Sequence, residues 1–486
     1  MKNLQPQIVW NHFYEISQIP RPSKKEDKIR AYLQEFGAKN NFETKTDKAG
    51  NVLITKPATP GYEDKKTVIL QAHMDMVCEK NSGVEFNFET DAIQTEIRGE
   101  WLHAKGTTLG ADNGIGMALM LAVLSSADVK HPKLECLFTT DEETGLTGAF
   151  ALEENWLTGD VLINLDSEDD GEIFVGCAGG IDTTAYFRYK TRKTPSGYFA
   201  FSVQVSGLLG GHSGDDINKG LANANKVLNR ILWNMHAEMD LRIAKIDGGN
   251  LHNAIPREAS ALAVVPYADK EKVRVIFNQI ASDIEHENKE VETKMRLALH
   301  SEDVPVETMN KKSTRRLLNM IYACLHGVKA MSADMPGLVE TSTNLASVKM
   351  LENDTVKIVT SQRSSVESAK YDIAHQVEAV FRLGGCKVSH GDGYPGWKPN
   401  LNSDILKVAE KSYEKLFNQT PKIKAIHAGL ECGLFLKKYP HLDMISIGPT
   451  MRGVHSPDER LHIPAVGKAW EWLVEILATP NPTPNP

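Results

Sequence analysis

The sequence predicts an α/β protein with a mostly parallel central sheet, interrupted by an inserted α+β domain. In the first 166 residues, short apolar segments alternate with helical segments, which is typical of a parallel sheet with crossover helices. After about residue 181 the pattern changes to hairpin-like strands and longer amphipathic helices. The alternating pattern returns after the segment YPGWKPN at residues 394–400, so both ends of the chain are expected to form one domain.

The composition is that of an ordinary globular protein. The chain has 486 residues, of which 41% are hydrophobic and 24% charged, and this length favours two or three domains. The net charge of −8 argues against a nucleic acid or an anionic membrane as a partner. The sequence shows no signal-peptide pattern and no apolar run of roughly 20 residues. We therefore expect a cytoplasmic protein whose six scattered cysteines are free thiols.

Helices and strands can be placed from the spacing of apolar residues. Two helices are expected within residues 6–40. In the rest of the α/β part we expect strands at 51–55, 67–73, 134–140, 161–166 and 444–448, and helices at 113–124 and 403–417. In the insert we expect strands at 199–207 and 261–267, helices at 218–236 and 268–290, and a further helix, strand pair and helix through 314–385.

These elements predict four segments along the chain. The first part of the α/β domain would span residues 1–186, the insert 187–394, and the second part of the α/β domain 395–478. The proline-rich tail, residues 479–486, cannot continue a helix and is expected to be disordered.

Polar residues lie where the apolar segments end, and functional residues gather at the carboxyl ends of parallel strands. His73 and Asp75 are two residues apart at such an end, so their side chains point to the same side. Both are costly to bury without a partner. A hydrogen bond that fixes a loop and a role as metal ligand explain this pair equally well.

Further carboxylates follow the same rule. Asp112 lies in the glycine-rich turn GTTLGADNGIGMA, where it could cap the next helix or bridge two cations with its two oxygens. Glu142 and Glu143 follow a core strand in the acidic run DEE, whose like charges would take up protons unless cations lay between them. The alternative for this run is a solvated acidic loop. Asp166 ends another apolar segment, and His455 follows the last one through a loop rich in glycine and proline.

Two histidines and several carboxylates, each at the end of a different core strand, together predict a metal centre. Zinc accepts imidazole nitrogen and carboxylate oxygen, and a catalytic zinc site keeps one position for water. Paired metal ions hold the attacking and leaving groups of a hydrolysis and lower the pKa of the bound water. A carboxylate that is not needed as a ligand could serve as general base.

These motifs resemble those of a known family. HMDM, GADNGIG, DEETG, NLDSE and GVHSPDE are similar to the metal motifs of the dizinc exopeptidases that include aminoacylase and the glutamate carboxypeptidases. GTTLGADNGIGMA, GCAGGID, KGLANANK, HNAIPREA, YPGW and HAGLECGLF resemble the aminoacyl-histidine dipeptidases (Xaa-His, carnosinase-like) over essentially the whole chain. The resemblance implies a dizinc exopeptidase catalytic domain, an insert that serves as lid or dimerisation domain, a homodimer, and hydrolysis of dipeptides such as β-Ala-His.

The resemblance also implies roles for single residues of the catalytic domain. Two zinc ions, replaceable by Co²⁺ or Mn²⁺, would share one bridging carboxylate: His73 and Asp166 would hold one ion, Glu143 and His455 the other, and Asp112 both. Asp75 would orient His73 and fix its tautomer. Glu142 would take a proton from the metal-bridging water and pass it to the leaving amine.

Within the insert, the resemblance implies that His212 donates to the oxyanion of the tetrahedral intermediate, a contact whose loss can cost about a hundredfold in rate. Asn253 and Arg363 would bind the substrate, Arg363 through the free carboxylate of the dipeptide. Gly429 and Glu431 would line the pocket and meet the substrate amine. Without the resemblance, His212 would be interpreted as an ordinary loop residue and Arg363 as a surface ion-pair partner.

The size of the insert suggests an internal repeat. Its length of about 200 residues is normal for a domain. It is, however, about twice the length that a single small α/β dimerisation module needs. We expect two tandem halves divided near residue 300. With such halves His212 could reach the active site within one subunit, and a dimer would not be required for catalysis.

Two other functions are compatible with the sequence. One is a related deacylase or carboxypeptidase that acts on N-acyl amino acids. The other is a catalytically silent binding protein, against which the retained Glu142 and metal ligands argue. A serine or cysteine hydrolase is disfavoured because G-x-S-x-G is absent, and Cys78 and Cys177 have no evident base.

Overall fold

The computed structural model describes residues 1 and 3–479, so the tail predicted to be disordered, residues 479–486, falls outside the described residues except for Thr479. The chain forms two compact units. Unit 1 comprises Met1–Cys177, Trp397–Ala425 and Leu430–Pro486, and unit 2 comprises Ala178–Gly396 and Ile426–Gly429. The boundary predicted between residues 186 and 187 would cut strand β9 (Gly179–Arg188). Because β9 pairs along its whole length with β20, it belongs to unit 2.

Unit 1 is built on an eight-stranded sheet with the order β1-β2-β6-β3-β7-β23-β8-β22. Its strands are β1 (Glu43–Thr46), β2 (Val52–Lys56), β3 (Val68–His73), β6 (Leu134–Thr139), β7 (Val161–Asn164), β8 (Glu172–Cys177), β22 (Lys422–Ile426) and β23 (Asp443–Ser446). The four central strands β6, β3, β7 and β23 are parallel, whereas β1, β2 and β8 pair antiparallel with their neighbours. The central strands are buried on both faces, as continuous apolar segments predict, and the expected parallel centre is confirmed.

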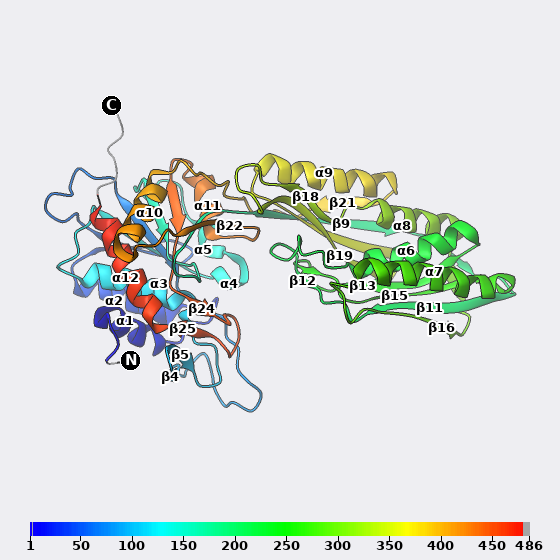
Figure 1. The fold of residues 1–486 in the computed structure, drawn as a ribbon, viewed down its shortest axis with the longest axis horizontal. Coiled ribbons are helices and arrows are strands. Elements are labelled where there is room, and N and C mark those ends of the chain that lie inside the picture. Colours follow the sequence, from blue (N-terminus) through cyan, green and yellow to red (C-terminus); the bar gives the residue numbers. More distant parts are fainter. Residues whose placement is uncertain (2, 480–486) are drawn as a thin grey trace. The chain divides into compact units, whose positions relative to one another are not determined.

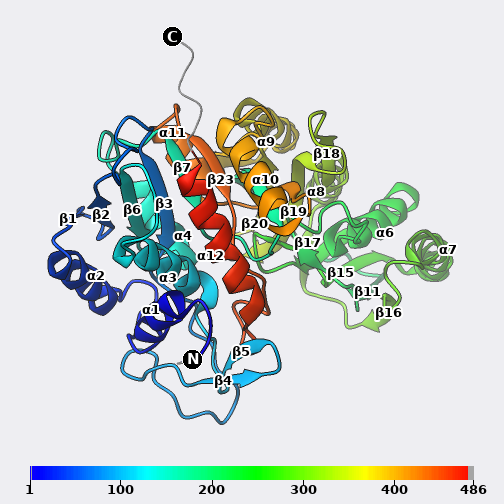
Figure 2. The same cartoon turned by 60° about the vertical axis from the view of Figure 1, so that its left-hand side comes forward.

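Helices cover this sheet. They are α1 (Gln7–Ser17), α2 (Asp27–Lys39), α3 (Ala111–Ser125), α4 (Glu142–Gly145), α5 (Thr147–Ala151), α10 (Asp404–Phe417), α11 (Glu431–Lys438) and α12 (Ile463–Ala478). Helix α3 packs on β3 and α1, and α10 packs against α12 (Figure 2). A small four-stranded sheet of β24 (Met451–Arg452), β25 (Arg460–His462), β5 (Trp101–Ala104) and β4 (Thr95–Arg98) joins the two ends of the chain. The elements expected here agree with the structure to within two residues at each end.

Unit 2 is built on a nine-stranded antiparallel sheet with the order β16-β11-β15-β13-β19-β20-β9-β21, and β18 pairs with β19 (Figure 1). Besides β9, its strands are β11 (Tyr198–Ser206), β13 (Arg242–Gly248), β15 (Ala259–Pro266), β16 (Arg296–Glu302), β18 (Gly327–Met331), β19 (Val339–Leu351), β20 (Thr355–Ser364) and β21 (Lys387–His390). Its helices α6 (Ala224–Glu238), α7 (Lys270–Asn288), α8 (Lys311–Ala323) and α9 (Glu367–Leu383) enclose an apolar core with the strands.

Helix α6 begins later than the predicted residue 218. The side chain of Asn223 accepts hydrogen bonds from the backbone N–H groups of Asn225 and Lys226, at 3.0 and 3.3 Å. This is the geometry of a helix N-cap, and it sets the first turn of α6 at Ala224. Residues 218–223, with the sequence NKGLAN, form a turn followed by a segment without regular structure.

Unit 2 contains the same β-α-β-β-α-β arrangement twice. The inner copy consists of β11, α6, β13, β15, α7 and β16, and the outer copy of β9, α8, β19, β20, α9 and β21. In both copies the strands follow the order fourth, first, third, second across the sheet. The outer copy begins with β9, before the inner copy, so the copies are nested and the expected tandem division near residue 300 is wrong. Strands β10 (Thr191–Lys193) and β17 (Glu307–Met309) pair where the inner copy begins and ends.

Two further features concern the described part of the chain. None of the helices in residues 1 and 3–479 combines the length and the apolar character that crossing a membrane requires. All six cysteines lie in the described part and are free, as expected.

The loop that leads into α3 is held by one buried carboxylate. Glu459 is 2% exposed. Its two oxygens accept four backbone N–H groups, at 2.7, 2.9, 2.7 and 3.2 Å, from Leu109, Gly110, Ala111 and Asp112. These donors precede or begin a helix and have no partner within it, and a negative charge at a helix N-terminus is favourable. Glu459 therefore fixes the backbone that carries Asp112.

The same loop is held from the other side by Arg21, which is also 2% exposed. Its guanidinium donates to the carbonyls of Met74, at 3.2 Å, of Asp75, at 2.7 Å, and of Gly110. Gly110 has a φ of 67°, and a Cβ there would lie 2.6 Å from Nη2 of Arg21. Position 110 thus requires glycine, and Arg21 joins the end of β3 to the start of α3.

We expect Glu459→Gln to destabilise unit 1. The glutamine amide has only one acceptor oxygen, and its NH₂ group would face backbone N–H groups that now donate to a carboxylate oxygen. Because these buried donors would lose their acceptor, we expect the free energy of unfolding to fall by about 2–4 kcal/mol. Urea denaturation would measure it, with Glu471→Gln, at an exposed position of α12, as matched control. Equal denaturation midpoints for the two variants would show that Glu459 does not hold the loop.

Candidate active site

Five of the residues predicted as ligands converge in unit 1 where the parallel strands end. His73 ends β3, Asp166 follows β7, Glu143 lies in α4, Asp112 in the first turn of α3, and His455 between β24 and β25. The Nε2 atom of His73 lies 2.9 Å from Oδ1 of Asp112 and 3.5 Å from Oδ1 of Asp166. The Nε2 atom of His455 lies 3.0 Å from Oδ2 of Asp112 and 3.1 Å from Oε2 of Glu143. The two oxygens of Asp112 therefore face different histidines.

The donor set of this cluster fits two cations. His73, Asp112 and Asp166 form one group whose ligand atoms lie within 4.8 Å of one another, and Asp112, Glu143 and His455 form a second. The buried atoms Oδ1 of Asp166 and Oε1 of Glu143 accept no hydrogen bond from any described residue. Imidazole nitrogen and carboxylate oxygen are the ligands that zinc takes. A divalent cation in each group would satisfy atoms that the protein itself leaves without a partner.

The pKa values in the cluster are shifted by burial and by the closeness of its charged groups. Burial raises the pKa of Asp166 to about 6, against the opposing effect of His73. Hydrogen bonds to Asp112 and Glu143 raise the pKa of His455 to about 11. Carboxylates this close together stay ionised only when protons on the histidines or cations offset their charge.

Asp75 and Glu142 lie beside the cluster. Asp75 is fully buried, and its Oδ1 lies 3.3 Å from Nδ1 of His73. The oxygens of Asp75 also accept the backbone N–H groups of Glu142 and Glu143, at 3.0 and 3.2 Å. Burial raises the pKa of Glu142 well above its ordinary value, although His73 opposes this shift. Asp75 thus lies within ion-pair distance of the ring of His73 and holds the start of α4 by hydrogen bonds.

Glu142 reaches the same region of space as the ligands. Together with His73 and Glu143 it forms another group whose ligand atoms lie within 4.8 Å of one another. A further group of Glu26, Asp75 and Asp141 is entirely acidic and buried. Its oxygens accept hydrogen bonds from hydroxyl groups and backbone N–H groups of neighbouring residues, which accounts for the group without a cation.

Glu431, which the resemblance places in the pocket, is deeply buried. It is 1% exposed and begins α11. Its Oε2 accepts hydrogen bonds from Nε2 of Gln71, at 2.6 Å, and from Oγ1 of Thr139, at 3.0 Å. Burial raises its pKa to about 8. The carboxylate therefore faces the buried ends of β3 and β6 and does not line an open surface.

The residues predicted to contact substrate from the insert lie together within unit 2. His212 is in β12 (Gly211–His212), which pairs with β14 (Ala254–Ile255). Arg363, in β20, places its Nη2 atom 3.4 Å from Nε2 of His212. The carbonyl of Asn253 accepts the N–H group of Ser213 at 2.8 Å, which sets the Asn253 loop beside His212.

Two residues of this group, Tyr394 and His427, were not predicted. The hydroxyl of Tyr394 accepts a hydrogen bond from Nη1 of Arg363 at 2.9 Å. A Cβ at Gly429 would lie 2.8 Å from the ring of Tyr394, so glycine allows this close approach. His427 lies 2.8 Å from the hydroxyl of Ser342, and burial lowers its pKa to about 4. Both residues lie in motifs that carried the resemblance, YPGW and HAGLECGLF, but nothing in the sequence shows which member of each motif approaches Arg363.

Comparison with known proteins tests the resemblance stated above. Residues 69–479 match peptidase family M20/M25/M40. The cytosol non-specific dipeptidase of Escherichia coli (strain K12) is 44% identical over 477 residues, which are 98% of each protein.

Solved structures agree with this assignment. The crystal structure of aminoacylhistidine dipeptidase from Vibrio alginolyticus matches with a TM-score of 0.93 and 42% identity, covering 99% of this chain and 98% of that one. Aminopeptidase PepT from Bacillus cereus, at 17% identity and a TM-score of 0.58 over 98% of both chains, shares the fold. With the resemblance confirmed from both sequence and structure, the chain belongs to peptidase family M20/M25/M40 and is a metallopeptidase, a peptide hydrolase.

Proposed function

We propose that this protein is a cytoplasmic dipeptidase that hydrolyses Xaa-His peptides such as β-Ala-His, among other dipeptides, at a centre of two zinc ions. The observation that carries this proposal is the position of Asp112, whose two oxygens face His73 and His455 in two separate ligand groups. The names of the two most similar relatives described above, a cytosol dipeptidase and an aminoacylhistidine dipeptidase, support the substrate class and the location.

In this proposal, one cation is held by His73, Asp112 and Asp166, and the other by Asp112, Glu143 and His455, with Co²⁺ or Mn²⁺ able to replace zinc. The bound cations would polarise the scissile carbonyl and lower the pKa of a water molecule at the centre. The partnerless buried oxygens of Asp166 and Glu143 support this assignment. Asp75 keeps the ring of His73 oriented through its contact with Nδ1, which leaves Nε2 directed at the centre.

Glu142 is the proposed general base. It would take a proton from the attacking water and deliver it to the leaving amine. Its burial and raised pKa support this role, because a carboxylate that gains a proton readily can hold it until the amine departs. The hydrogen bond from its backbone N–H to Asp75 fixes where the side chain begins.

The residues of unit 2 are proposed to bind the substrate. Arg363 would pair with the free carboxylate of the dipeptide, and His212 would donate to the oxyanion. Arg363 is 6% exposed, and its Nε atom has no hydrogen-bond partner among the described residues, which supports a ligand there. Asn253 and Gly429 are proposed to line the substrate position. Contact of Glu431 with the substrate amine stays a prediction, and the burial of Glu431 argues against a direct contact.

The substrate class and the metal requirement can be tested together. We expect the purified protein to release free amino acids from Gly-His and β-Ala-His and to leave N-acetyl amino acids intact, as measured by chromatography. Removal of metal by a chelator should abolish hydrolysis, and Zn²⁺, Co²⁺ or Mn²⁺ should restore it, because the five proposed ligands lie close together and three of them are carboxylates that repel one another unless cations offset their charge. Hydrolysis by metal-free protein would contradict the metal centre, and faster cleavage of N-acetyl amino acids would indicate the deacylase instead.

Glu142→Gln should separate catalysis from metal binding. The amide cannot accept the proton of water, so we expect turnover to fall at least about a hundredfold, while the metal content by elemental analysis stays that of the unmodified protein. Glu154→Gln, at an exposed position, is the matched control. Turnover near that of the control would remove Glu142 from the role of base.

We also propose that the protein is a homodimer in which His212 serves the metal centre of its own subunit. The support is the second β-α-β-β-α-β copy, which makes unit 2 twice the size of a single module. Loss of the oxyanion donor in His212→Ala should lower turnover about a hundredfold.

Mixed assemblies of His212→Ala and Glu142→Ala subunits test this arrangement. If His212 acts within its own subunit, every active site in the mixture lacks one of the two residues, so turnover should equal the sum of the two parents. Recovery of activity on mixing would show that His212 acts across subunits. Sedimentation analysis of the same samples would show whether dimers were present.

A further inference from the structure

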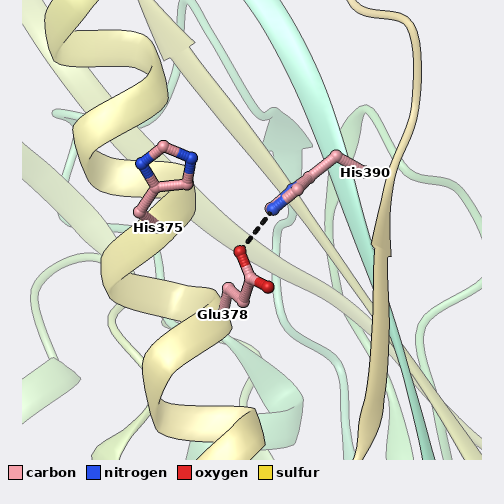
Figure 3. Close-up of side chains that lie close together, drawn as sticks. All are labelled: His375, Glu378 and His390. Carbon is pink, nitrogen blue, oxygen red and sulfur yellow. Dashed lines mark hydrogen bonds and ion pairs between the residues drawn. The ribbon is translucent and has the colours of Figure 1, made fainter.

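Unit 2 carries a second cluster of metal-binding side chains, separate from every residue discussed so far. His375 and Glu378 lie on α9, and His390 is the last residue of β21. One ligand atom from each residue lies within 4.8 Å of the other two. Figure 3 shows the three side chains converging between the helix and the strand.

The backbone explains why these three side chains meet. Residues three apart on a helix lie on the same face, so His375 and Glu378 project together from α9. Helix α9 packs against β9 and β21, and His390 is paired with Thr183 of β9. The side chains of His390 and Glu378 are 25% and 18% exposed, and His375 is exposed. The cluster is therefore held by a packed helix and sheet, and solvent can reach it.

Buried hydrogen bonds behind His390 determine which of its ring nitrogens carries the proton. The amide of Gln362 is oriented because its Nε2 donates to Oγ1 of Thr360 at 2.7 Å. Its Oε1 therefore accepts the hydroxyl proton of Thr183, at 2.7 Å. Having used its proton, the Thr183 oxygen can only accept from Nδ1 of His390, at 2.9 Å. Thr183, Thr360 and Gln362 are fully buried, so this order of donors is enforced.

With the proton on Nδ1, the neutral ring of His390 presents the lone pair of Nε2 to Oε2 of Glu378, 2.9 Å away. The Nε2 atom of His390 and the Oε2 atom of Glu378 would then both be acceptors. At this distance they need either a second proton on the imidazole ring or a cation that both atoms bind. Histidines that bind metals commonly donate their other ring N–H to a neighbouring oxygen, as His390 does to Thr183. The second oxygen of Glu378 accepts from Nε of Arg382 at 2.5 Å, which leaves Oε2 for the site.

We propose that His375, Glu378 and His390 bind one Zn²⁺ ion, independently of the peptidase centre. Two imidazoles and one carboxylate, with room for water, form a ligand set that zinc accepts in tetrahedral geometry. Calcium and magnesium favour oxygen ligands and would bind poorly. The nearby positive charge of Arg382 should weaken the site. The bound ion would join α9 to the edge strand β21 and stabilise this part of unit 2.

Counting zinc tests this proposal. The holoenzyme, with its peptidase centre already saturated, would be dialysed against micromolar Zn²⁺ and its bound metal counted by native mass spectrometry. We expect one more zinc ion in the unmodified protein than in His375→Ala or Glu378→Gln. His300→Ala, which removes an exposed histidine on β16, should keep the additional ion. Dipeptide turnover should be the same in all variants, because none of these residues belongs to the peptidase centre.

Thermal unfolding provides a second measurement. Because a ligand that binds only the folded state stabilises it, added Zn²⁺ should raise the Tm of the holoenzyme and of His300→Ala. The same addition should leave the Tm of His375→Ala unchanged, and His375 is exposed enough for this variant to fold. Equal zinc counts in His375→Ala, Glu378→Gln and the unmodified protein would overturn the proposal. The count is a difference between variants, so it does not depend on how many ions the peptidase centre holds.

Discussion

The cluster of His73, Asp112 and His455 depends on how the backbone of Asp112 is held. Its carboxylate faces His73 on one side and, 343 residues further along the chain, His455 on the other. Two buried charges, Glu459 and Arg21, bind the loop that carries it. Each of these charges is costly to bury without its full set of hydrogen bonds. Glu459 and Arg21 can be buried only when the loop has this conformation, and the loop keeps this conformation only while both residues bind it. The position of Asp112 follows from this arrangement.

The helices and strands of unit 1 could be predicted because each is a continuous apolar segment bounded by polar or glycine-rich residues. The convergence of ligands could be predicted from one general rule, that parallel strands end at the same edge of a sheet. The roles of Glu459 and Arg21 in holding the loop could not be predicted from the sequence. Glu459 binds Leu109, 350 residues earlier in the chain, and a lone glutamate in GVHSPDE carries no sign of that contact. Arg21 likewise acts through backbone carbonyls, which leave no pattern in the sequence.

In unit 2 the sequence predicted the size and the doubling but not the topology. The nested order depends on β9 pairing with β20 and β21, which follow it by more than a hundred residues. Such pairing is set by the complete sheet and not by local propensity. The late start of α6 has a different cause: the side chain of Asn223 caps the helix and sets its first turn at Ala224. Tyr394 was missed because its contact with Arg363 exists only once these strands are aligned.

Nesting also explains how the residues of unit 2 come to lie together. His212 and Asn253 belong to the inner copy, whereas Arg363 and Tyr394 belong to the outer copy or the segment that follows it. The two copies share one sheet through the short pairing of β13 with β19, and Asn344 of β19 donates to the carbonyl of Ala254 at 2.8 Å. The contact between His212 and Arg363 is therefore a contact between copies. The inserted copy does more than enlarge the unit, because it supplies the histidine that lies beside Arg363.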